Sequence, residues 1–559
     1  MSMITNYKEL LNKVVQFKQF SESSNVEIIK IVIIYSVALI VDLLTLMILT
    51  PLLEFFFNDS SLKITQKIEN FLSIQLTPQI LVTSLIGLSF SRAILNVYAG
   101  YKVAEFVEGI KIRKRNVVLN ALGMLKIEDY QKLKSGTILN TLVAELNRVG
   151  QIFSVFFSFI NGCLTFLSFL YVSIMVSYQV TFFALFVSII KFKIVSRLTN
   201  STTSYGEMFT KVNEKISSKI VSLISSLKTL KILGKFEYAK KKIYDSFIQN
   251  KFITEKFVFL KGLASHLDEL LTVIILIFLL VVSKYYFNTS IAELGVIFFC
   301  FNRILRSVSI FQKINITIRS EKFSFVNISN LLLNWEKNKQ MNGTVKQSFK
   351  EYIKFENVSY SINENKIINN INLKLKKNKF YMIYGKSGIG KSIFLDLLVG
   401  IRTPKTGKIS YDKIDLNDID KNFLYGRIGY VSADNNLFGK HIRESIELGV
   451  KISKSKFNDL MDNFLINEFS KNPDQIIYDQ KNNFSSGQIQ RVAMARGFVN
   501  AKDFLILDEA TANLNSKFED KIFKNINLLK KKLTIVLVTH NKKLSKFADE
   551  CINFEEINK

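Results

Sequence analysis

The stretch that decides the fold of the C-terminal part of the chain is FYMIYGKSGIGKSIFLDLLV, residues 380–399. It opens with an apolar run of strand type, Phe380–Tyr384, and closes with a helical run, Ser392–Val399. Between them, GKSGIGKS matches the pattern G-x-x-x-x-G-K-[ST] in the strand, loop and helix context that this pattern requires. Such glycines let backbone N–H groups surround phosphate oxygens, and the start of the helix adds its positive dipole end. The predicted phosphate-binding residues are Gly385, Lys386, Ser387, Gly388, Ile389, Gly390, Lys391 and Ser392.

A second apolar run of strand type, Phe504–Leu507, ends in two carboxylates, Asp508 and Glu509. In a P-loop protein, a carboxylate at such a strand end holds Mg²⁺ together with the loop hydroxyl, here Ser392. The following carboxylate is placed to polarise the attacking water as a general base. The predicted cofactors are therefore ATP and Mg²⁺, with Lys391 reaching the β and γ phosphates.

Between these two motifs lies FSSGQIQR, residues 484–491, which resembles the signature segment of ATP-binding cassette (ABC) proteins, usually L-S-G-G-Q-x-Q-R. The resemblance implies that Ser485, Gly487 and Gln488 contact the ATP held on the opposite domain of a head-to-tail dimer. It also implies that His540, directly after the last strand run, is the switch histidine that acts with Glu509 in catalysis.

The sequence departs from the family pattern at several places. Ala433 stands where a glutamine is usual, so a metal or water contact is lost unless residues 434–435 replace it. Ile362 occupies the position of the adenine-stacking aromatic, and Tyr360, two residues earlier and on the same face of a continuing strand, is the candidate substitute. Asn515 replaces an aspartate in the segment after the catalytic glutamate. These departures predict slow turnover rather than an inactive domain.

Six apolar runs precede residue 320, and most reach the ~20 residues that a helix needs to cross a bilayer. They are Ile28–Phe57, Gln79–Tyr101, Ile152–Tyr178, Val180–Ile190, Leu270–Phe287 and Ile291–Ile304. The predicted fold is an all-α, six-helix transmembrane domain with long cytoplasmic extensions, followed by an α/β P-loop ABC nucleotide-binding domain. The predicted boundaries are a cytoplasmic N-terminal segment at 1–27, the transmembrane domain at 28–320, a linker at 321–350 and the nucleotide-binding domain at 351–559.

Composition supports a membrane protein. The 559 residues are 48% hydrophobic, which excludes a disordered chain, and three scattered cysteines exclude a disulfide framework. Lys and Arg number 75 against 47 Asp and Glu, a net charge of +28. The basic residues concentrate between spans two and three and between spans four and five, so the positive-inside rule explains the charge without nucleic-acid binding. Both segments and the nucleotide-binding domain are predicted in the cytoplasm, and the Lys-, Asn-, Ile- and Phe-rich usage suggests a bacterial cytoplasmic membrane.

The two long basic segments have few helix breakers and predict helices that extend into the cytoplasm and turn back at Ile127–Leu133 and Ser226–Gly234. Residues 130–138, followed by Glu145, and residues 230–237 are similar to the two cytoplasmic turns of ABC exporters. The resemblance implies that these turns are coupling helices that dock on the nucleotide-binding domains.

Ionisable residues in or near the spans are the candidates for substrate contacts. They are Asp42, Arg92, Glu269, Arg303 and Arg306. Clustered arginines suit a phosphate or pyrophosphate, and SRAILNVY at 91–98 resembles the lipid-linked oligosaccharide flippases of this family. Ile310, however, stands where those flippases carry a further arginine.

Three functions remain open from the sequence. The first is an ABC half-transporter that exports or flips an amphipathic substrate, such as a lipid-linked oligosaccharide, a lipid or a peptide. One chain carries both halves of a composite ATP site, so a homodimer suffices and a heterodimer is the alternative. The second is a membrane-anchored regulatory ABC ATPase with weak or no transport, and the third is a soluble ABC ATPase that binds DNA.

Overall fold

The computed structural model describes residues 25–56, 77–133, 135–287, 291–362, 364–433, 435–470, 472–474, 484–512, 514–527 and 532–558. The chain forms two units. The first extends to Asn338, except for Lys126–Glu128, which group with the second unit, Lys339–Lys559.

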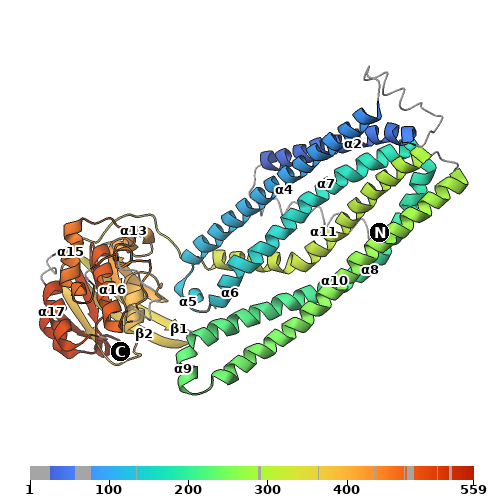
Figure 1. The fold of residues 1–559 in the computed structure, drawn as a ribbon. Coiled ribbons are helices and arrows are strands. Elements are labelled where there is room, and N and C mark those ends of the chain that lie inside the picture. The colour runs from blue at the N-terminus through green and yellow to red at the C-terminus, as the bar shows by residue number, and fades with distance from the viewer. Residues whose placement is uncertain are drawn as a thin grey trace. The chain divides into compact units, whose positions relative to one another are not determined.

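Long helices build the first unit (Figure 1). The elements from Asn25 to Lys337 are α2 (Asn25–Phe56), α4 (Pro78–Gly123), α5 (Ile127–Tyr130), α6 (Ser135–Asn140), the π-helical turn η1 (Thr141–Glu145), α7 (Leu146–Val176), α8 (Tyr178–Ser225), α9 (Leu227–Ile232), α10 (Phe236–Phe287) and α11 (Ile291–Lys337). The six long helices pack mainly as the pairs α2–α4, α7–α11 and α8–α10. Five of the six predicted apolar runs fall within one of these long helices, apart from Phe57, which lies outside the described residues. The third run, Ile152–Tyr178, extends past the end of α7 at Val176 to the first residue of α8.

Local sequence signals fix several helix ends. Thr77 caps α4, because its hydroxyl accepts a hydrogen bond from the Ile80 N–H at 3.4 Å, and Pro78 suits the first helical position. Gly234 ends α9 with a φ of +65°, and the N–H of Lys235 donates to the carbonyl of Leu230 at 2.8 Å. This is the left-handed helix stop that glycine favours. The two predicted cytoplasmic turns thus contain the short helices α5 and α9.

Three helical stretches in the described part of the chain are long and apolar enough to cross a membrane: Asn25–Leu53, Pro78–Gly123 and Gly136–Val176. Tyr178–Lys191 is a shorter apolar stretch. Many apolar side chains on these helices point outward, such as Phe90 and Val97, which suits a lipid-facing surface. The chain is a multi-pass membrane protein on these grounds, while the number of six spans remains a prediction.

Helix α11 continues well past the sixth apolar run. It ends at Lys337, so the first part of the segment predicted as a linker, residues 321–337, is helical. Ile328 is fully buried in a cluster with Ile31 and Phe106, and Trp335 is buried beside Val118. Apolar side chains at helical spacing therefore hold this part of α11 within the first unit.

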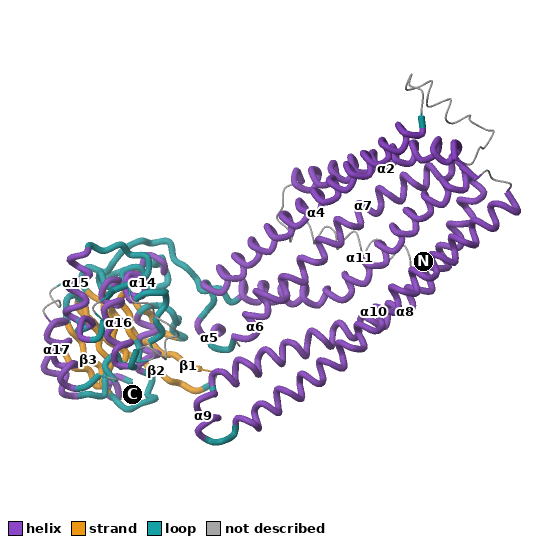
Figure 2. The backbone as a smooth tube through the Cα atoms, viewed as in Figure 1, coloured by secondary structure: helices purple, strands orange, loops and turns teal. Residues whose placement is uncertain are grey.

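The second unit is an α/β domain with two sheets (Figure 2). The antiparallel sheet has the order β2-β1-β4-β5, with β1 (Tyr352–Ile362), β2 (Asn365–Lys376), β4 (Thr406–Tyr411) and β5 (Ile414–Asp415). The parallel sheet has the order β6-β7-β8-β3-β9, with β3 (Phe380–Tyr384), β6 (Ile428–Val431), β7 (Phe504–Asp508), β8 (Thr534–Val538) and β9 (Glu550–Asn553). The helical elements are α12 (Lys391–Leu398), α13 (Lys421–Tyr425), α14 (Ile442–Glu447), α15 (Lys454–Asn463), η2 (Ile466–Glu468), α16 (Ser486–Asn500), α17 (Ser516–Asn527), η3 (Lys542–Phe547) and α18 (Phe554–Ile557).

Both faces of the parallel sheet are buried. Phe380 and Met382 of β3 belong to one apolar cluster, whereas Tyr381 and Ile383 belong to the other. Side chains alternate between the faces of a strand, so a strand covered on both sides is apolar throughout. The register pairs Asp508 of β7 with Val538 of β8. The carboxyl ends of the central strands therefore meet at one edge, where the site described next is built.

Candidate functional site

The loop between β3 and α12 has the backbone shape of a phosphate cradle. Gly388 and Gly390 have φ values of +79° and +108°, a region that side-chain-bearing residues rarely adopt. A Cβ built on Gly390 would lie 2.8 Å from the Cγ2 atom of Ile367. Glycine is thus required at this position both by the backbone angle and by the packing of β2.

Lys391 begins α12 and folds its side chain back across the loop. Its Nζ donates to the carbonyl oxygens of Gly385 at 2.9 Å and Lys386 at 2.7 Å. Burial lowers the pKa of this ammonium, and the nearby Glu509 and Asp508 oppose that shift. The ammonium therefore lies within the loop, close to two carboxylates at the end of β7.

Asp508 is the last residue of β7 and is buried. Burial raises the pKa of its carboxyl group, while a hydrogen bond from Ser392 opposes that shift. The Tyr430 hydroxyl, from β6, lies 3.5 Å from Asp508 Oδ2. A hydroxyl and a carboxylate within hydrogen-bonding distance are hard oxygen donors of the kind that Mg²⁺ prefers, so Ser392 and Asp508 fit that ion. A bound Mg²⁺ would balance the charge of the buried carboxylate and of phosphate oxygens.

Glu509 and His540 meet just beyond the ends of the neighbouring strands β7 and β8. Glu509 Oε1 lies 2.8 Å from His540 Nε2. Glu509 has a φ of +51°, and its N–H donates to the Val538 carbonyl at 2.9 Å. A left-handed backbone at a residue other than glycine is uncommon and turns the side chain away from the strand. Both side chains are partly exposed, so water can reach the carboxylate.

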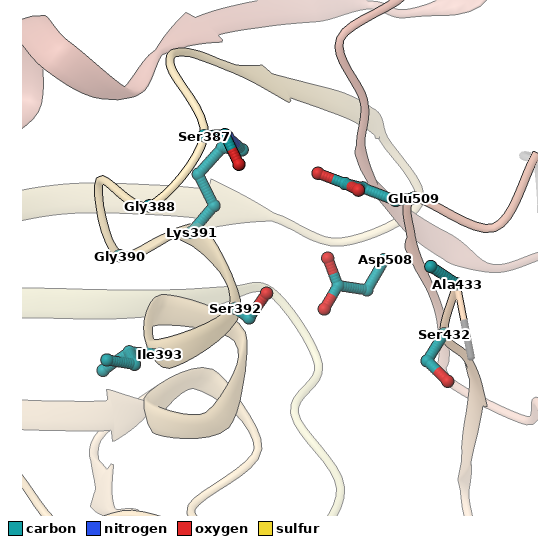
Figure 3. Close-up of a pocket in the computed structure, with 10 residues that line it drawn as sticks. All are labelled: Ser387, Gly388, Gly390, Lys391, Ser392, Ile393, Ser432, Ala433, Asp508 and Glu509. Atoms are coloured by element: carbon teal, nitrogen blue, oxygen red, sulfur yellow. The ribbon is translucent and has the colours of Figure 1, made fainter. Parts of the chain in front are cut away.

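The phosphate-loop residues and the carboxylates of Asp508 and Glu509 line one open cavity of about 460 Å³ (Figure 3). In Figure 3, the carboxylates of Asp508 and Glu509 face the loop that carries Lys391, and Ala433 lies beside them. The lining residues are Ser387, Gly388, Gly390, Lys391, Ser392, Ile393, Ser432, Ala433, Asp508 and Glu509. The methyl group of Ala433 provides no ligand or hydrogen bond there.

The signature segment forms the start of another helix of the same domain. The Ser485 hydroxyl accepts from the Gln488 N–H at 3.3 Å, and the Gln488 side chain accepts from the Ser485 N–H at 2.8 Å. This reciprocal capping box begins α16. Ser485, Gly487 and Gln488 are not among the described residues that line the cavity of Figure 3. Asp434, a possible substitute for the missing glutamine, lies outside the described residues.

The two candidates for adenine contact differ in accessibility. The ring of Tyr360 is buried, and its hydroxyl donates to Glu128 Oε1 at 2.7 Å and accepts from Arg402 Nη1 at 2.9 Å. Ile362, at the end of β1, is 40% exposed. A base can stack only on an accessible face, so this geometry favours Ile362 and leaves Tyr360 with a structural hydrogen-bonding role.

Some residues at the site escaped the sequence analysis. Tyr430 lies in β6, and Ser432 directly follows that strand. The pairing of β6 with β7 places both residues near Asp508. Asn515 has a defined local role: its side chain accepts from the Phe518 N–H at 3.0 Å at the start of α17. An aspartate there would make the same contact with a negative charge.

The candidate substrate residues divide into two groups in the first unit. Asp42 Oδ1 lies 2.7 Å from Arg92 Nε and 3.2 Å from Arg303 Nη2, and Arg306 lines the same cavity. Glu269 is not in this cluster: its carboxylate is exposed and lies 3.4 Å from His266 Nδ1, one helical turn away on α10. The structure thus brings four of the five candidates together.

Comparisons with known proteins agree with this architecture. Residues 368–512 match the ABC transporter family. The heterocyst differentiation ATP-binding protein HepA of Nostoc sp. is 26% identical over 84% of this chain and 78% of its own length. The leukotoxin translocation ATP-binding protein LktB of Mannheimia haemolytica is 34% identical over 37% of this chain but only 30% of its own length. A bacterial Atm1-family ABC exporter, solved with ATP bound, has the same fold, with a TM-score of 0.79, 15% identity and coverage of 95% of this chain and 94% of that chain.

The fold and the site together define an ABC-type ATPase joined to a helical membrane domain. Residues 368–512 carry the ABC transporter domain, and the chain as a whole has the fold of an ABC exporter half-transporter, with one helical membrane domain and one ATP-binding domain.

Proposed function

We propose that two copies of this chain form a homodimer that hydrolyses ATP to export an amphipathic substrate across a bacterial cytoplasmic membrane. The single observation that carries this proposal is the cavity in which Lys391, Ser392, Asp508 and Glu509 converge. The signature residues start a different helix of the same domain. Each chain would therefore use its own loop for one ATP and offer Ser485 and Gly487 to the ATP of its partner.

The residues of the cavity divide the chemistry among them. Backbone N–H groups of the loop and Lys391 would hold the phosphates, and Ser392 with Asp508 would hold Mg²⁺, which supplies charge neutralisation. Glu509 would take a proton from water as that water attacks the γ phosphorus and ADP departs. His540 would hold the Glu509 carboxylate toward the water, which their 2.8 Å contact supports.

The experiment is ATP hydrolysis by the full-length protein in lipid nanodiscs. We expect Glu509→Gln to reduce the rate by ~10²–10⁴-fold, the usual contribution of a general base. Glu356→Gln is the matched control, since this exposed glutamate pairs with Lys354 on the same strand, β1. Equal rates in the wild type and Glu509→Gln would refute the assignment of Glu509.

A second function, regulation of a partner by a weakly hydrolysing ATPase, is favoured by Ala433 and Asn515 at positions where the family carries polar or acidic groups. The two functions differ in transport. Proteoliposomes that contain a fluorescent lipid-linked glycan, a labelled phospholipid or a labelled peptide would show ATP-dependent movement of one of them if the chain is an exporter. ATP binding without movement of any of these would favour the regulatory function.

The relatives suggest different substrates. The name of LktB refers to translocation of a leukotoxin, but that match covers only about a third of this chain. HepA is matched over most of this chain, and its name describes a developmental role. The substrate is better approached through the polar residues of the membrane domain itself.

A further inference from the structure

Helix α17 carries a buried carboxylate on the face that packs against the core. Glu519 is 7% exposed and shares this face with Ile522, Phe523 and Ile526, which belong to a buried apolar cluster. Residues at i, i+3, i+4 and i+7 lie on one side of a helix, so an apolar side chain is expected at the first of these positions. A carboxylate there is costly to bury unless hydrogen bonds hold it.

Each oxygen of the Glu519 carboxylate accepts a hydrogen bond from a different loop. Oε1 accepts from the Thr511 hydroxyl at 2.7 Å, and Oε2 accepts from Asn541 Nδ2 at 2.7 Å. Thr511 lies two residues after Glu509, and Asn541 directly follows His540. Hydrogen bonds to an ionised acceptor are roughly twice as strong as those between neutral groups. Glu519 therefore connects the loop after β7 to the loop after β8, an arrangement that we call the Glu519 bridge.

The pairing of β7 with β8 does not extend as far as the catalytic side chains. Among the described residues, the last backbone hydrogen bond between the two segments joins the Glu509 N–H to the Val538 carbonyl at 2.9 Å. Beyond it the chain turns, and the Ala512 N–H donates back to the Glu509 carbonyl at 3.1 Å. The contact between Glu509 and His540 at 2.8 Å thus lies past the end of the sheet. Side-chain contacts such as the Glu519 bridge must hold the two loops together there.

Asn541 connects the bridge to the backbone beside His540. Its N–H donates to the Thr539 hydroxyl at 3.0 Å, and its Oδ1 accepts from the Lys543 N–H at 3.1 Å. Its Nδ2 donates to Glu519, so both the backbone and the side chain of Asn541 are held. The imidazole of His540 therefore extends from a backbone that is fixed on both sides.

We propose that Glu519 is a positioning residue for ATP hydrolysis, because it holds the loops of Glu509 and His540 at the separation that their contact needs. The inference rests on the proposed function in taking Glu509 as the general base. Glu519 is not among the described residues that line the ATP cavity, so it acts through the two loops. A misplacement of about 1 Å that originates far from the chemistry can reduce a rate by ~10²-fold.

The test is steady-state ATP hydrolysis by full-length variants in lipid nanodiscs. Glu519→Leu removes both hydrogen bonds, and we expect kcat to fall by ~10–100-fold. The KM for ATP and the binding of a fluorescent ATP analogue should change little, since the phosphate loop lies between β3 and α12. Glu519→Gln should recover most of the loss, because its amide oxygen can accept from Asn541 while its NH₂ group donates to the Thr511 hydroxyl.

A double-mutant cycle with His540→Ala separates positioning from a general loss of structure. Glu519→Leu should reduce kcat by a clearly smaller factor in the His540→Ala background than in the wild type, since the contact that it supports is already gone. Asp520→Leu is the matched control, because this neighbouring carboxylate of α17 is exposed and pairs with Lys546 at 2.9 Å. It should hydrolyse ATP as the wild type does.

The unfolding temperature verifies that each variant folds. Where Glu519→Leu does not fold, Thr511→Val replaces it, since this change exchanges only a hydroxyl for a methyl group and removes one bond of the bridge. Unchanged kcat in the folded variant overturns the inference. An equal loss of kcat in the wild-type and His540→Ala backgrounds also overturns it.

The same measurements separate this inference from the proposed function. Hydrolysis that is lost in Glu509→Gln but unchanged in folded Glu519→Leu refutes the positioning role alone. Hydrolysis that is unchanged in Glu509→Gln refutes the general base itself, whatever the Glu519 variants show.

Discussion

The imidazole of His540 and the carboxylate of Glu509 meet at 2.8 Å, Nε2 to Oε1, although 31 residues separate them in the chain. Adjacent parallel strands bring them together, because Asp508 of β7 pairs with Val538 of β8. Glu509 also holds a left-handed backbone at φ +51°. A strained residue with a fixed partner at the mouth of a phosphate loop is expected where orientation matters for chemistry.

The first prediction concerns this pair. His540→Ala removes the imidazole that contacts Glu509 but leaves the phosphate loop unchanged. We expect kcat to fall by ~10–100-fold, less than the full effect of losing a general base, while the KM for ATP changes little. Steady-state ATPase kinetics measure both quantities. A large rise in KM at constant kcat would show instead that His540 serves ATP binding.

The second prediction concerns Ala433, which lines the cavity beside Asp508. Ala433→Gln adds an amide that can hold a water or a metal ligand. One hydrogen bond contributes ~1 kcal/mol, so we expect kcat to rise about fivefold. Ala433→Leu fills similar space without polar atoms and should give no increase. An equal gain in both variants would mean that packing, and not the amide, limits turnover.

The third prediction concerns Gly390. Gly390→Ala puts a methyl group 2.8 Å from Ile367 on a backbone with φ +108°, a strain of roughly 1–3 kcal/mol in the loop. We expect weaker binding of a fluorescent ATP analogue. Gly123→Ala, at the end of α4 and with open space around the added carbon, should bind as the wild type does. Unchanged binding in Gly390→Ala would show that the loop does not need this conformation.

The fourth prediction uses pH. Lys421 is buried at the start of α13, its Nζ donates to the Leu416 carbonyl at 2.5 Å, and burial lowers its pKa to about 8. The unfolded chain keeps a pKa near 10.5 and binds more protons between these values, so stability rises with pH across that window. Below pH 8 the cost of the buried charge is fully present, of the order of 3 kcal/mol.

Lys421→Met removes that charge and should raise the unfolding temperature at pH 7. This gain should shrink as the pH approaches 10, because the wild-type lysine then becomes neutral. Thermal unfolding of both proteins at several pH values provides the measurement. A difference that stays constant from pH 7 to 10 would contradict the lowered pKa.

The sequence predicted those helices and strands that are encoded by a short run of neighbouring residues. The predicted strand runs Phe380–Tyr384 and Phe504–Leu507 correspond to β3 and β7, because each is a short apolar run bounded by polar or turn residues. The ends of α8, α10 and α11 were harder to predict from the sequence. Outside the apolar runs these helices carry both polar and apolar residues, and the apolar residues recur at helical spacing only weakly. Trp335, for example, lies in a stretch that is polar in sequence, and tertiary packing on Val118 keeps it helical.

Contacts between residues far apart in the chain could not be predicted from the sequence. Strand alternation placed Tyr360 on the face of Ile362, but the hydroxyl of Tyr360 bonds Glu128, 232 residues away, and Arg402. Asp42 and Arg303 are 261 residues apart, and only the packing of α2 and α4 with α11 makes them partners. Both residues were candidates because they are ionisable side chains in or near apolar runs. The ion pair that joins them depends on the folded structure and could not be predicted.

The last prediction addresses the Asp42 ion pairs as a structural unit. Asp42 is almost fully buried, so Asp42→Asn leaves two guanidinium groups facing an amide without a counter-charge. Breaking one partner of a buried pair costs roughly 3 kcal/mol or more, so the unfolding temperature in detergent should fall clearly. The double variant Asp42→Asn, Arg303→Met removes the carboxylate and one of the opposing charges, and should recover part of the loss. A double-mutant cycle isolates this coupling, because Arg303→Met alone leaves Asp42 paired with Arg92. Additive effects of the two substitutions would show that the contact at 3.2 Å contributes nothing to stability.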